Sequence, residues 1–282
     1  MIDPLPTLLV EPVIRAALLE DLGRAGDITT MSVVPAEARM RCHLAARQQG
    51  RLAGIEVAKA TFRLIEPAIH IETLRSDGDP VEAGQPVLLL DGSARAILTA
   101  ERTALNLASR LSGIATATAA MVAAVRPHKA RITCTRKTTP GLRALEKQAI
   151  RAGGGLNHRF GLDDAILIKD NHIAIAGGVA VAIERAKQMA GHLVKIEVEV
   201  DTIGQLEEAM RVGVDAVLLD NMAPSVLAEA VRMVAGRAIT EASGRVSPAT
   251  VHAIAASGVD LISVGWLTHS APILDLGLDV LT

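Results

Sequence analysis

The most constraining feature of this sequence is a set of short, apolar, β-branched segments that recur at nearly equal spacing in its second half. Four of these segments end in Glu199, Asp220, Ser243 and Gly265, and the end points are 21, 23 and 22 residues apart. Ala-rich amphipathic stretches fill the intervals, and one strand, one loop and one helix together need about this length. The spacing therefore predicts repeated βα units around a parallel sheet, in the form of an α/β barrel.

Two earlier apolar segments fit the same barrel, and cations follow both of them. Arg136 and Lys137 come directly after 132–134, and Lys169 ends 165–169. In an α/β barrel, the residues at the carboxyl ends of the strands converge on one face and form the site. We therefore expect these cations to share that face with the polar ends of the later strands.

The first half of the chain has a different, mixed pattern. Residues 11–22 have helical spacing, and alternating segments follow at 40–47, 68–74 and 86–90, which indicates an α+β arrangement. A long stretch rich in Ala, Leu and Thr, 98–125, predicts one or two helices that link the halves. We expect the domain boundary to lie inside this stretch.

Composition excludes several classes of protein. Three aromatic residues and a net charge of −2 among 282 residues disfavour nucleic-acid binding. The longest uncharged run, 111–125, is too short to cross a bilayer, so no membrane span is expected. Asp3 and Glu11 do not suit a signal peptide, and Cys42 and Cys134 lie in unrelated segments, which predicts a reduced, cytoplasmic protein.

Cations are concentrated between residues 128 and 172. Nine Lys or Arg against four acids give this segment a net charge of +5, so the rest of the chain carries −7. Such a reversal favours binding of a polyanionic small molecule. Arg143, Lys147 and Arg151, spaced at four beside Glu146, are instead expected on a solvated helix face.

Glycines and carboxylates leave two interpretations open. Three glycines, 153–155, precede His158 and Arg159, and they mark either a phosphate loop or an ordinary turn. Glu199 and Asp220 either hold Mg²⁺ together with phosphates or simply balance neighbouring lysines. The glycines near Ser243 and at Gly265 suit backbone binding of phosphate, or tight turns alone.

Long, ordered motifs across nearly the whole chain resemble the quinolinate phosphoribosyltransferases, the nicotinate-nucleotide pyrophosphorylases of NAD biosynthesis. They include EDLGRAGDITT (20–30), ERTALNLASRLSGIAT (101–116), TRKTTPGLRALEK (135–147), GGGLNHRFGL (153–162) and LIKDNH (167–172). The segments VEVD, LLDN, EASG and SVGWLTHSAPILDLGLD continue the resemblance to the end. It implies an α/β fold of two domains: an N-terminal α/β sandwich, 1–113, completed by 268–282, and an incomplete α/β barrel, 114–267.

The resemblance also implies a role for each site residue. The quinolinate pocket would be formed by Arg136, Lys137, His158, Arg159 and Lys169, with Arg102 entering from the other subunit of a homodimer. Glu199 and Asp220 would face phosphoribosyl pyrophosphate and its Mg²⁺, and the 5-phosphate would bind at Ser243, Gly244 and Gly265. Lys137, Lys169, Glu199 and Asp220 would be the catalytic residues.

The chemistry of the implied reaction agrees with these residue types. Quinolinate carries two adjacent carboxylates, which guanidinium groups bind with paired, charge-assisted hydrogen bonds. Its ring nitrogen attacks ribose C1 as pyrophosphate leaves, so Mg²⁺ and a lysine are useful beside the leaving group. The ribosylated nitrogen is cationic and accepts the electron pair left at C2, so loss of CO₂ follows transfer and yields nicotinate mononucleotide.

Three other interpretations and one departure accompany the resemblance. A molybdenum-operon homologue of the same family is the nearest rival, and a barrel lyase with Lys169 as a Schiff base is another. Residues 78–90 look like a lipoyl-carrier hairpin, but no lysine lies between Lys59 and Lys129 to carry the group. Arg245 stands where the family usually has a small residue, and we expect it to have an ordinary φ and to lie on the surface.

Overall fold

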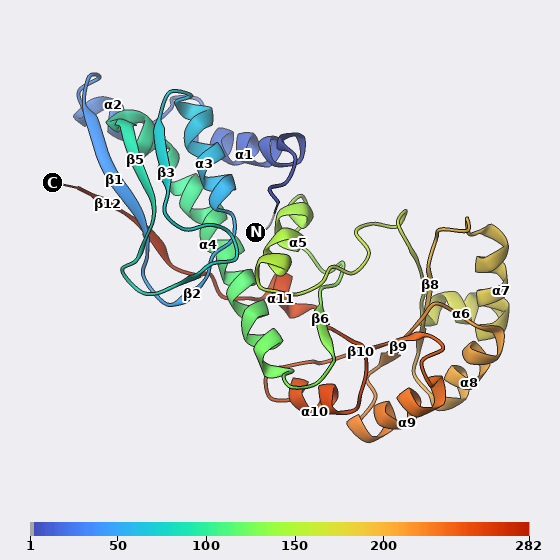
Figure 1. The fold of residues 1–282 in the computed structure, drawn as a ribbon. Coiled ribbons are helices and arrows are strands. Elements are labelled where there is room, and N and C mark those ends of the chain that lie inside the picture. The colour runs from blue at the N-terminus through green and yellow to red at the C-terminus, as the bar shows by residue number, and fades with distance from the viewer. Residues whose placement is uncertain (1–2, 282) are drawn as a thin grey trace. The chain divides into compact units, whose positions relative to one another are not determined.

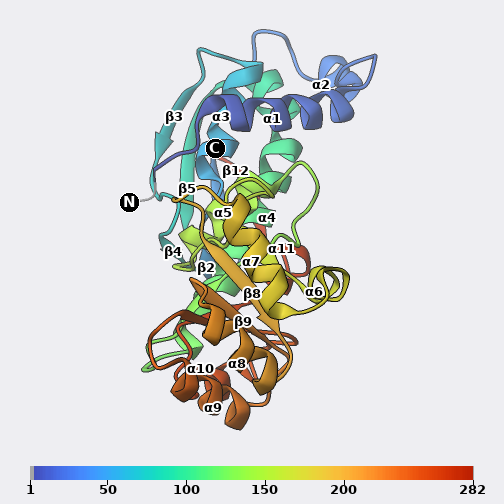
Figure 2. The ribbon, with the colours of Figure 1, turned by 90° about the vertical axis from the view of Figure 1, so that its right-hand side faces the viewer.

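The structure, a computed structural model, describes residues 3–281, and its internal contacts divide the chain into two compact units (Figures 1 and 2). Unit 1 contains Met1–Ala119, Thr138–Gly154 and Leu267–Thr282, and unit 2 contains Ala120–Lys137 and Gly155–Trp266. The sequence placed the domain boundary at residue 113 and assigned residues 138–154 to the barrel, whereas the internal contacts group 138–154 with unit 1.

Unit 1 contains an antiparallel sheet with helices packed against it. Its elements are α1 (Thr7–Leu22), α2 (Ile28–Val33), β1 (Arg39–Ala46), β2 (Gly50–Arg51), α3 (Ile55–Ile65), β3 (His70–Thr73), β4 (Pro80–Val81), β5 (Pro86–Ser93), most of α4 (Ala94–Ala124), α5 (Arg143–Ala152), α11 (Trp266–His269) and β12 (Leu276–Val280). The main sheet has the order β12-β1-β5-β3, and β2 pairs with β4. The C-terminal strand β12 lies at the sheet edge, where Leu276 pairs with Ala46.

One hydrophobic core holds unit 1 together. Leu44, Leu88 and Leu90 from the sheet, Phe62 from α3 and Ile97 from α4 are all fully buried in it. Burial of one such side chain contributes about 1.5–3 kcal/mol to the free energy of folding. Because these side chains share one core, this face of the sheet and the two helices stabilise one another.

The stretch expected to be one or two helices is a single helix, α4. By length and composition it is apolar enough to cross a membrane, but half of its most apolar window is buried within the protein. Gly113 lies inside this helix without breaking it. The position needs glycine because the Pro272 carbonyl approaches so closely that a Cβ would collide with it. The apolar residues of α4 therefore form protein core.

Unit 2 is built around parallel strands, as the spacing predicted. Its elements are β6 (Arg131–Thr133), β7 (Ile166–Ile168), α6 (Asp170–Ala176), α7 (Val179–Met189), β8 (Ile196–Val200), α8 (Ile203–Val212), β9 (Ala216–Asp220), α9 (Pro224–Val234), β10 (Ile239–Ser243), α10 (Val251–Ala256) and β11 (Leu261–Ser263). The sheet order is β6-β11-β10-β9-β8-β7, with every pair parallel, and helices α7 to α10 follow one another along its outside (Figure 1). The expected α/β class is confirmed.

The alternation of side chains along β8 shows which face of this sheet carries chemistry. Ile196, Val198 and Val200 are buried, and α7 and α8 pack on this strand. Glu197 and Glu199 alternate with them and therefore point to the opposite, inner face.

The helix face expected to be solvated is only partly so: the prediction is confirmed for Arg151 and wrong for Lys147, and Arg143 is half-buried. Within α5, Glu146 is 0% and Lys147 2% exposed, whereas Arg151 is exposed. Glu146 accepts hydrogen bonds from Arg110 (Oε1 to Nη2, 2.6 Å) and from the Thr139 N–H (3.0 Å). Arg110 is half-buried in this ion pair, because a buried carboxylate needs a partner.

Candidate active site

The carboxyl ends of the unit 2 strands carry six of the expected site residues. β9 ends at Asp220 and β10 at Ser243, and these two residues pair in register. Lys169 directly follows β7, and Glu199 is the next-to-last residue of β8. Lys137 and Gly265 follow β6 and β11 closely, and a Cβ on Gly265 would lie 3.0 Å from Lys137 Cδ. The expectation that these strand ends share one edge of the sheet is met by the topology.

Lys169, Glu199 and Asp220 interact electrostatically. Lys169 Nζ lies 3.3 Å from Glu199 Oε2, and the Glu199 side chain is 14% exposed. Burial raises the pKa of Glu199 above its ordinary value; Lys169 opposes this rise, and the charges of Asp220 and Asp170 add to it. Two carboxylates that repel each other, with one lysine paired to Glu199, favour a further cation at this edge.

Arg136 and Arg159 also come close together. Burial lowers the pKa of Arg159, and the charge of Arg136 lowers it further, against the opposing effects of Asp164 and Glu197. Arg159 Nη1 donates to the Ala165 carbonyl at 3.1 Å. The Nε atoms of Arg136 and Arg159 are both buried without a hydrogen-bond partner among residues 3–281. Two desolvated guanidinium groups with spare donors are an arrangement that an anionic ligand would stabilise.

His158 is turned toward two carboxylates on the inner face of the sheet. Its Nε2 lies 2.9 Å from Glu197 Oε2 and 3.7 Å from Glu241 Oε1. Glu241, on β10, is 2% exposed, and burial together with the charge of Glu197 raises its pKa to about 7, although His158 and Ser263 act in the opposite sense. Sequence reasoning missed both glutamates. The signal was present, because each is an acid at an alternating inner position of an apolar strand.

Replacing Glu241 by Gln should change how stability depends on pH. The pKa is raised in the folded state, so the stability that this group contributes is fully present below about pH 4.5 and is lost as pH rises from there through 7. Glu241→Gln removes this titration, so its stability relative to the wild type should increase by about 2 kcal/mol between pH 5 and pH 8. Urea unfolding at both pH values measures the difference, and parallel curves for the two proteins would contradict the prediction.

Glycines among the expected site segments have different roles. Gly244 has φ +96°, and a Cβ there would collide with Asn221, so this position requires glycine. Gly153 is a packing glycine at the end of α5, where a Cβ would meet Ala115 and Thr118 of α4. Packing against α4 therefore accounts for glycine at position 153, the first residue of the segment that was interpreted as a phosphate loop or an ordinary turn.

Arg245 corrects one expectation about the backbone. Its φ is +49°, in the left-handed region, although its Cβ led us to expect an ordinary φ. It is exposed, as predicted. The left-handed turn that begins at Gly244 continues through Arg245, and the closing of this turn outweighs the strain of a single residue.

Arg102 belongs to unit 1, on α4. It is exposed, and no hydrogen bond or ion pair is seen for its side chain within residues 3–281. Asn106, one turn later on the same face of α4, is exposed as well.

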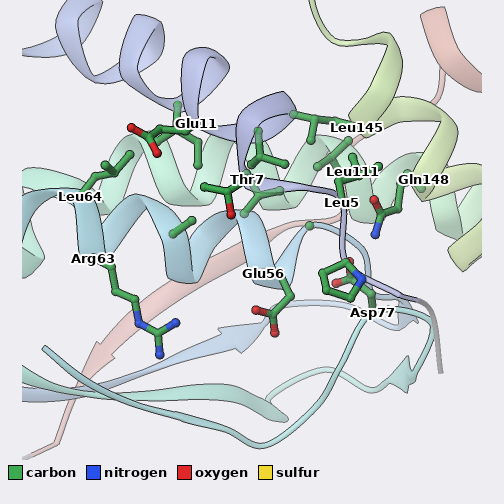
Figure 3. A pocket seen from close by; sticks show the side chains of 17 residues that line it. Leu5, Thr7, Glu11, Glu56, Arg63, Leu64, Asp77, Leu111, Leu145 and Gln148 are labelled. Carbon is green, nitrogen blue, oxygen red and sulfur yellow. The ribbon is translucent and has the colours of Figure 1, made fainter. Parts of the chain in front are cut away.

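A cavity of about 410 Å³ lies in unit 1, and none of the expected site residues lines it. Figure 3 shows its lining, which includes Leu5, Leu111 and Leu145. Two of its acids already have partners in the chain: Asp77 accepts the Ile55 N–H at the start of α3, and Glu56 pairs with Lys59. Gln148 Oε1 is buried without a hydrogen-bond partner among residues 3–281, but no charged group converges on it as a second ligand contact. A ligand site needs convergent polar groups as well as space, so the strand ends of unit 2 are the better candidate.

Parallel strands wrapped by helices, with lysines, arginines and carboxylates at one edge, define an α/β-barrel enzyme for anionic small molecules. Family models described as the N- and C-terminal domains of quinolinate phosphoribosyl transferase match residues 27–112 and 114–279. The chain belongs to the quinolinate phosphoribosyltransferase family.

Relatives and solved structures agree with this membership. The chain is 42% identical over 273 residues to a probable nicotinate-nucleotide pyrophosphorylase [carboxylating] of Bacillus subtilis, covering 97% of this chain and 94% of the relative. It is 45% identical over 275 residues to the Mycobacterium leprae nicotinate-nucleotide pyrophosphorylase [carboxylating], covering 95% of each. The crystal structure of NadC from Streptococcus pyogenes matches with a TM-score of 0.95 and 40% identity, covering 99% of this chain and 100% of that one.

Proposed function

We propose that this protein transfers the phosphoribosyl group of phosphoribosyl pyrophosphate to the ring nitrogen of quinolinate. The product then loses CO₂ to give nicotinate mononucleotide, a step of NAD biosynthesis. The two relatives described above, which align with at least 95% of this chain, carry names that refer to this reaction. We place the activity in the cytoplasm, in keeping with Cys42 and Cys134 being thiols rather than a disulfide.

The observation that carries this proposal is the pair formed by Arg136 and Arg159. Each guanidinium has a buried Nε without a partner among the described residues, and the two charges are near enough to lower the pKa of Arg159. Quinolinate has carboxylates on adjacent ring atoms, so it can accept hydrogen bonds from both groups at once and relieve their repulsion. A monocarboxylate would leave one guanidinium without a counter-charge.

Lys137 and Lys169 supply positive charge at the strand ends. In the proposed site they line the quinolinate pocket, and one of them stabilises the negative charge that develops on departing pyrophosphate. Glu199 already holds Lys169 at 3.3 Å, which orients the ammonium group toward this edge. Glu199 and Asp220 also favour the positive charge that develops on the ribose.

Glu199 and Asp220 fit a Mg²⁺ ion that binds together with phosphoribosyl pyrophosphate. Mg²⁺ takes hard oxygen ligands, commonly one or two carboxylates with phosphates completing the octahedron. Burial is the main cause that raises the pKa of Glu199, the charge of Asp220 adds to the rise, and a bound cation would oppose both effects. When bound, the ion would neutralise charge on the pyrophosphate leaving group.

Backbone groups near Ser243, Gly244 and Gly265 are the proposed site of the 5-phosphate. The absence of a Cβ at Gly244 and Gly265 lets Asn221 and Lys137 pack close to these loops. Glycine also allows a phosphate to approach backbone N–H groups closely. The phosphate would anchor the sugar while the ring nitrogen attacks C1 from the pocket of the arginines.

We further propose a homodimer in which Arg102 completes the partner's quinolinate pocket. Its exposed position on α4, with no hydrogen bond or ion pair seen for it within residues 3–281, supports a role outside its own chain. A third guanidinium would bind the outer carboxylate and close the pocket to water.

Glu199→Ala and Asp220→Ala should each lower kcat/KM for phosphoribosyl pyrophosphate by about a hundred-fold or more, because a charge that stabilises the transition state is removed. Quinolinate affinity should change by less than about threefold, since the dicarboxylate binds the arginines. Steady-state kinetics and calorimetry separate the two effects. Glu207→Ala, an exposed carboxylate on α8, is the control; if Glu199→Ala and Asp220→Ala retain wild-type kcat and Mg²⁺ dependence, these two carboxylates are structural counter-charges only.

The proposed function is tested by assaying quinolinate, nicotinate and nicotinamide side by side and measuring CO₂ and mononucleotide. If none of the three gives mononucleotide with phosphoribosyl pyrophosphate, the molybdenum-operon homologue becomes the better interpretation. The barrel lyase would instead give a covalent adduct at Lys169 on borohydride reduction in the presence of a carbonyl substrate.

A further inference from the structure

Buried Glu241 and half-buried Glu197, which lie beside a cavity on the inner face of the unit 2 sheet, have no part in the function described so far. The cavity, of about 200 Å³, lies beside the amino ends of the strands, and its lining includes His158, Arg159, Glu197, Ala216 and Glu241. Ala216 pairs in register with Glu197, and its small side chain leaves room for the two carboxylates. Buried acids rarely remain without a partner, so their arrangement around His158 needs an explanation.

The hydrogen bonds of His158 determine which ring nitrogen carries the proton. The main-chain N–H of Arg159 donates to Nδ1 at 2.8 Å. A backbone N–H can only donate, so Nδ1 must accept and cannot carry a proton. The proton is therefore on Nε2, which donates it to Glu197 Oε2 at 2.9 Å.

The same tautomer argues against a metal ion, although His158, Glu197 and Glu241 bring possible ligand atoms within 4.8 Å of one another. A metal would need the lone pair of Nε2, and Nδ1 would then have to carry the proton. The Arg159 N–H already occupies Nδ1 as a donor. The cluster is therefore built to orient the ring.

The loop after His158 holds the backbone of Arg159 from both sides. The N–H groups of Phe160 and Gly161 donate to the two carboxylate oxygens of Asp164, at 2.6 and 2.9 Å. The N–H groups of three consecutive residues, 159–161, are thus each bound by a side chain. A loop fixed in this way presents the Arg159 guanidinium without an ordering cost when an anion binds.

We propose that Glu197, together with Glu241, is a positioning residue for substrate binding: it holds the His158 ring in the Nε2–H tautomer, and His158 in turn fixes the main chain of Arg159. This inference rests on the proposed quinolinate pocket and assigns His158 a role through Arg159. Glu241 Oε1 lies 3.7 Å from the same Nε2, so in this proposal its carboxyl group adds to the attraction that keeps Nε2–H turned toward the glutamates.

The first test compares variants of Glu197. Glu197→Leu removes the acceptor, so the Kd of quinolinate should rise about ten-fold, whereas the Kd of phosphoribosyl pyrophosphate should change less than about twofold. Glu197→Gln keeps an acceptor oxygen, so it should restore quinolinate binding to within about threefold of the wild type. Calorimetry with each ligand alone measures both constants.

A second pair of variants keeps the test decisive if Glu197→Leu does not fold. In His158→Asn the amide oxygen takes the place of Nδ1 and can still accept the Arg159 N–H, whereas in His158→Leu it cannot. We expect quinolinate affinity to be better in the Asn variant than in the Leu variant by about ten-fold. Equal loss in both would mean that the ring contacts quinolinate itself, and would overturn the proposal.

Asp215→Ala is the matched control for loss of a carboxylate beside the same strand. Asp215 accepts the Ile196 N–H at the start of β8 (2.9 Å), and no hydrogen bond or ion pair joins it to His158 among the described residues. It should lower stability without a selective change in quinolinate affinity. If Asp215→Ala raises the quinolinate Kd as much as Glu197→Leu does, the effect is merely structural and the proposal fails.

The tautomer is measured independently of any substrate, by ¹⁵N NMR of the histidine rings with assignment from His158→Asn. The wild type should show Nε2 protonated and Nδ1 unprotonated; a protonated Nδ1 would overturn the proposal. Tight binding of Zn²⁺ that Glu241→Gln abolishes would overturn it in favour of a metal site. A wild type that binds no quinolinate would instead contradict the proposed function, while the NMR result still decides the arrangement of His158.

Discussion

Quinolinate is expected to be used about a thousand-fold more efficiently than nicotinate, measured as kcat/KM. Nicotinate lacks one of the two carboxylates, so one guanidinium of the Arg136 and Arg159 pair would remain desolvated without a counter-charge. A buried charge or donor left unpaired discriminates against an analogue far more strongly than a change in apolar contact does, commonly by 10⁴–10⁵-fold where a site is built to bind the missing group. The buried, partnerless Nε atoms of both arginines indicate a site of this kind.

Parallel measurement of CO₂ and of mononucleotide makes the comparison unambiguous, because nicotinate can give only the second product. Nicotinamide is a further control, since it has no carboxylate. Arg136→Leu should reduce the use of quinolinate and narrow the preference over nicotinate, because it removes the group that the second carboxylate satisfies. Turnover of nicotinate at a rate comparable to that of quinolinate by the wild type would contradict the assignment.

Arg102→Ala and Lys169→Ala are each expected to be nearly inactive, and a mixture of the two is expected to recover activity. If Arg102 enters the partner's site, a hybrid dimer has one site with both residues intact and one with neither. Random reassociation of equal amounts makes about half of the dimers hybrids, so the mixture should show about a quarter of wild-type activity. Co-refolding of differently tagged variants, followed by purification on both tags, isolates the hybrids for assay.

The control for this experiment is Arg151→Ala, which removes an exposed arginine from α5 and should retain activity alone. Mixing Arg151→Ala with Lys169→Ala should give activity from the first variant only in proportion to its amount. An absence of recovery in purified Arg102→Ala/Lys169→Ala hybrids would mean that Arg102 acts within its own chain. Full activity of Arg102→Ala alone would remove it from the site altogether.

Much of the α/β architecture was predictable because it is written in local patterns. The intervals between Glu199, Asp220, Ser243 and Gly265 equal one strand, loop and helix, so they predicted the parallel sheet and the shared edge of its strand ends. The proximity of Lys169 and Glu199 followed from the same rule, since β7 and β8 are neighbours in the sheet.

Local pattern failed where a side chain's surroundings come from distant parts of the chain. The spacing of Arg143, Lys147 and Arg151 predicted a solvated helix face, yet Glu146 on the same helix is buried against Arg110, 36 residues away in the sequence. Gly153 signalled a flexible turn, but it is glycine because α4 passes too close for a Cβ.

The sequence alone therefore determined the fold class, the shared edge of the polar strand ends and, through its motifs, the family. Those features depend on periodicity and spacing, which any stretch of chain carries by itself. Only the tertiary structure decided that Arg136 and Arg159 meet with spare donors, and that His158 faces Glu197 and Glu241. Such contacts depend on which inner side chains meet across a sheet, and thus on packing between segments that no local pattern connects.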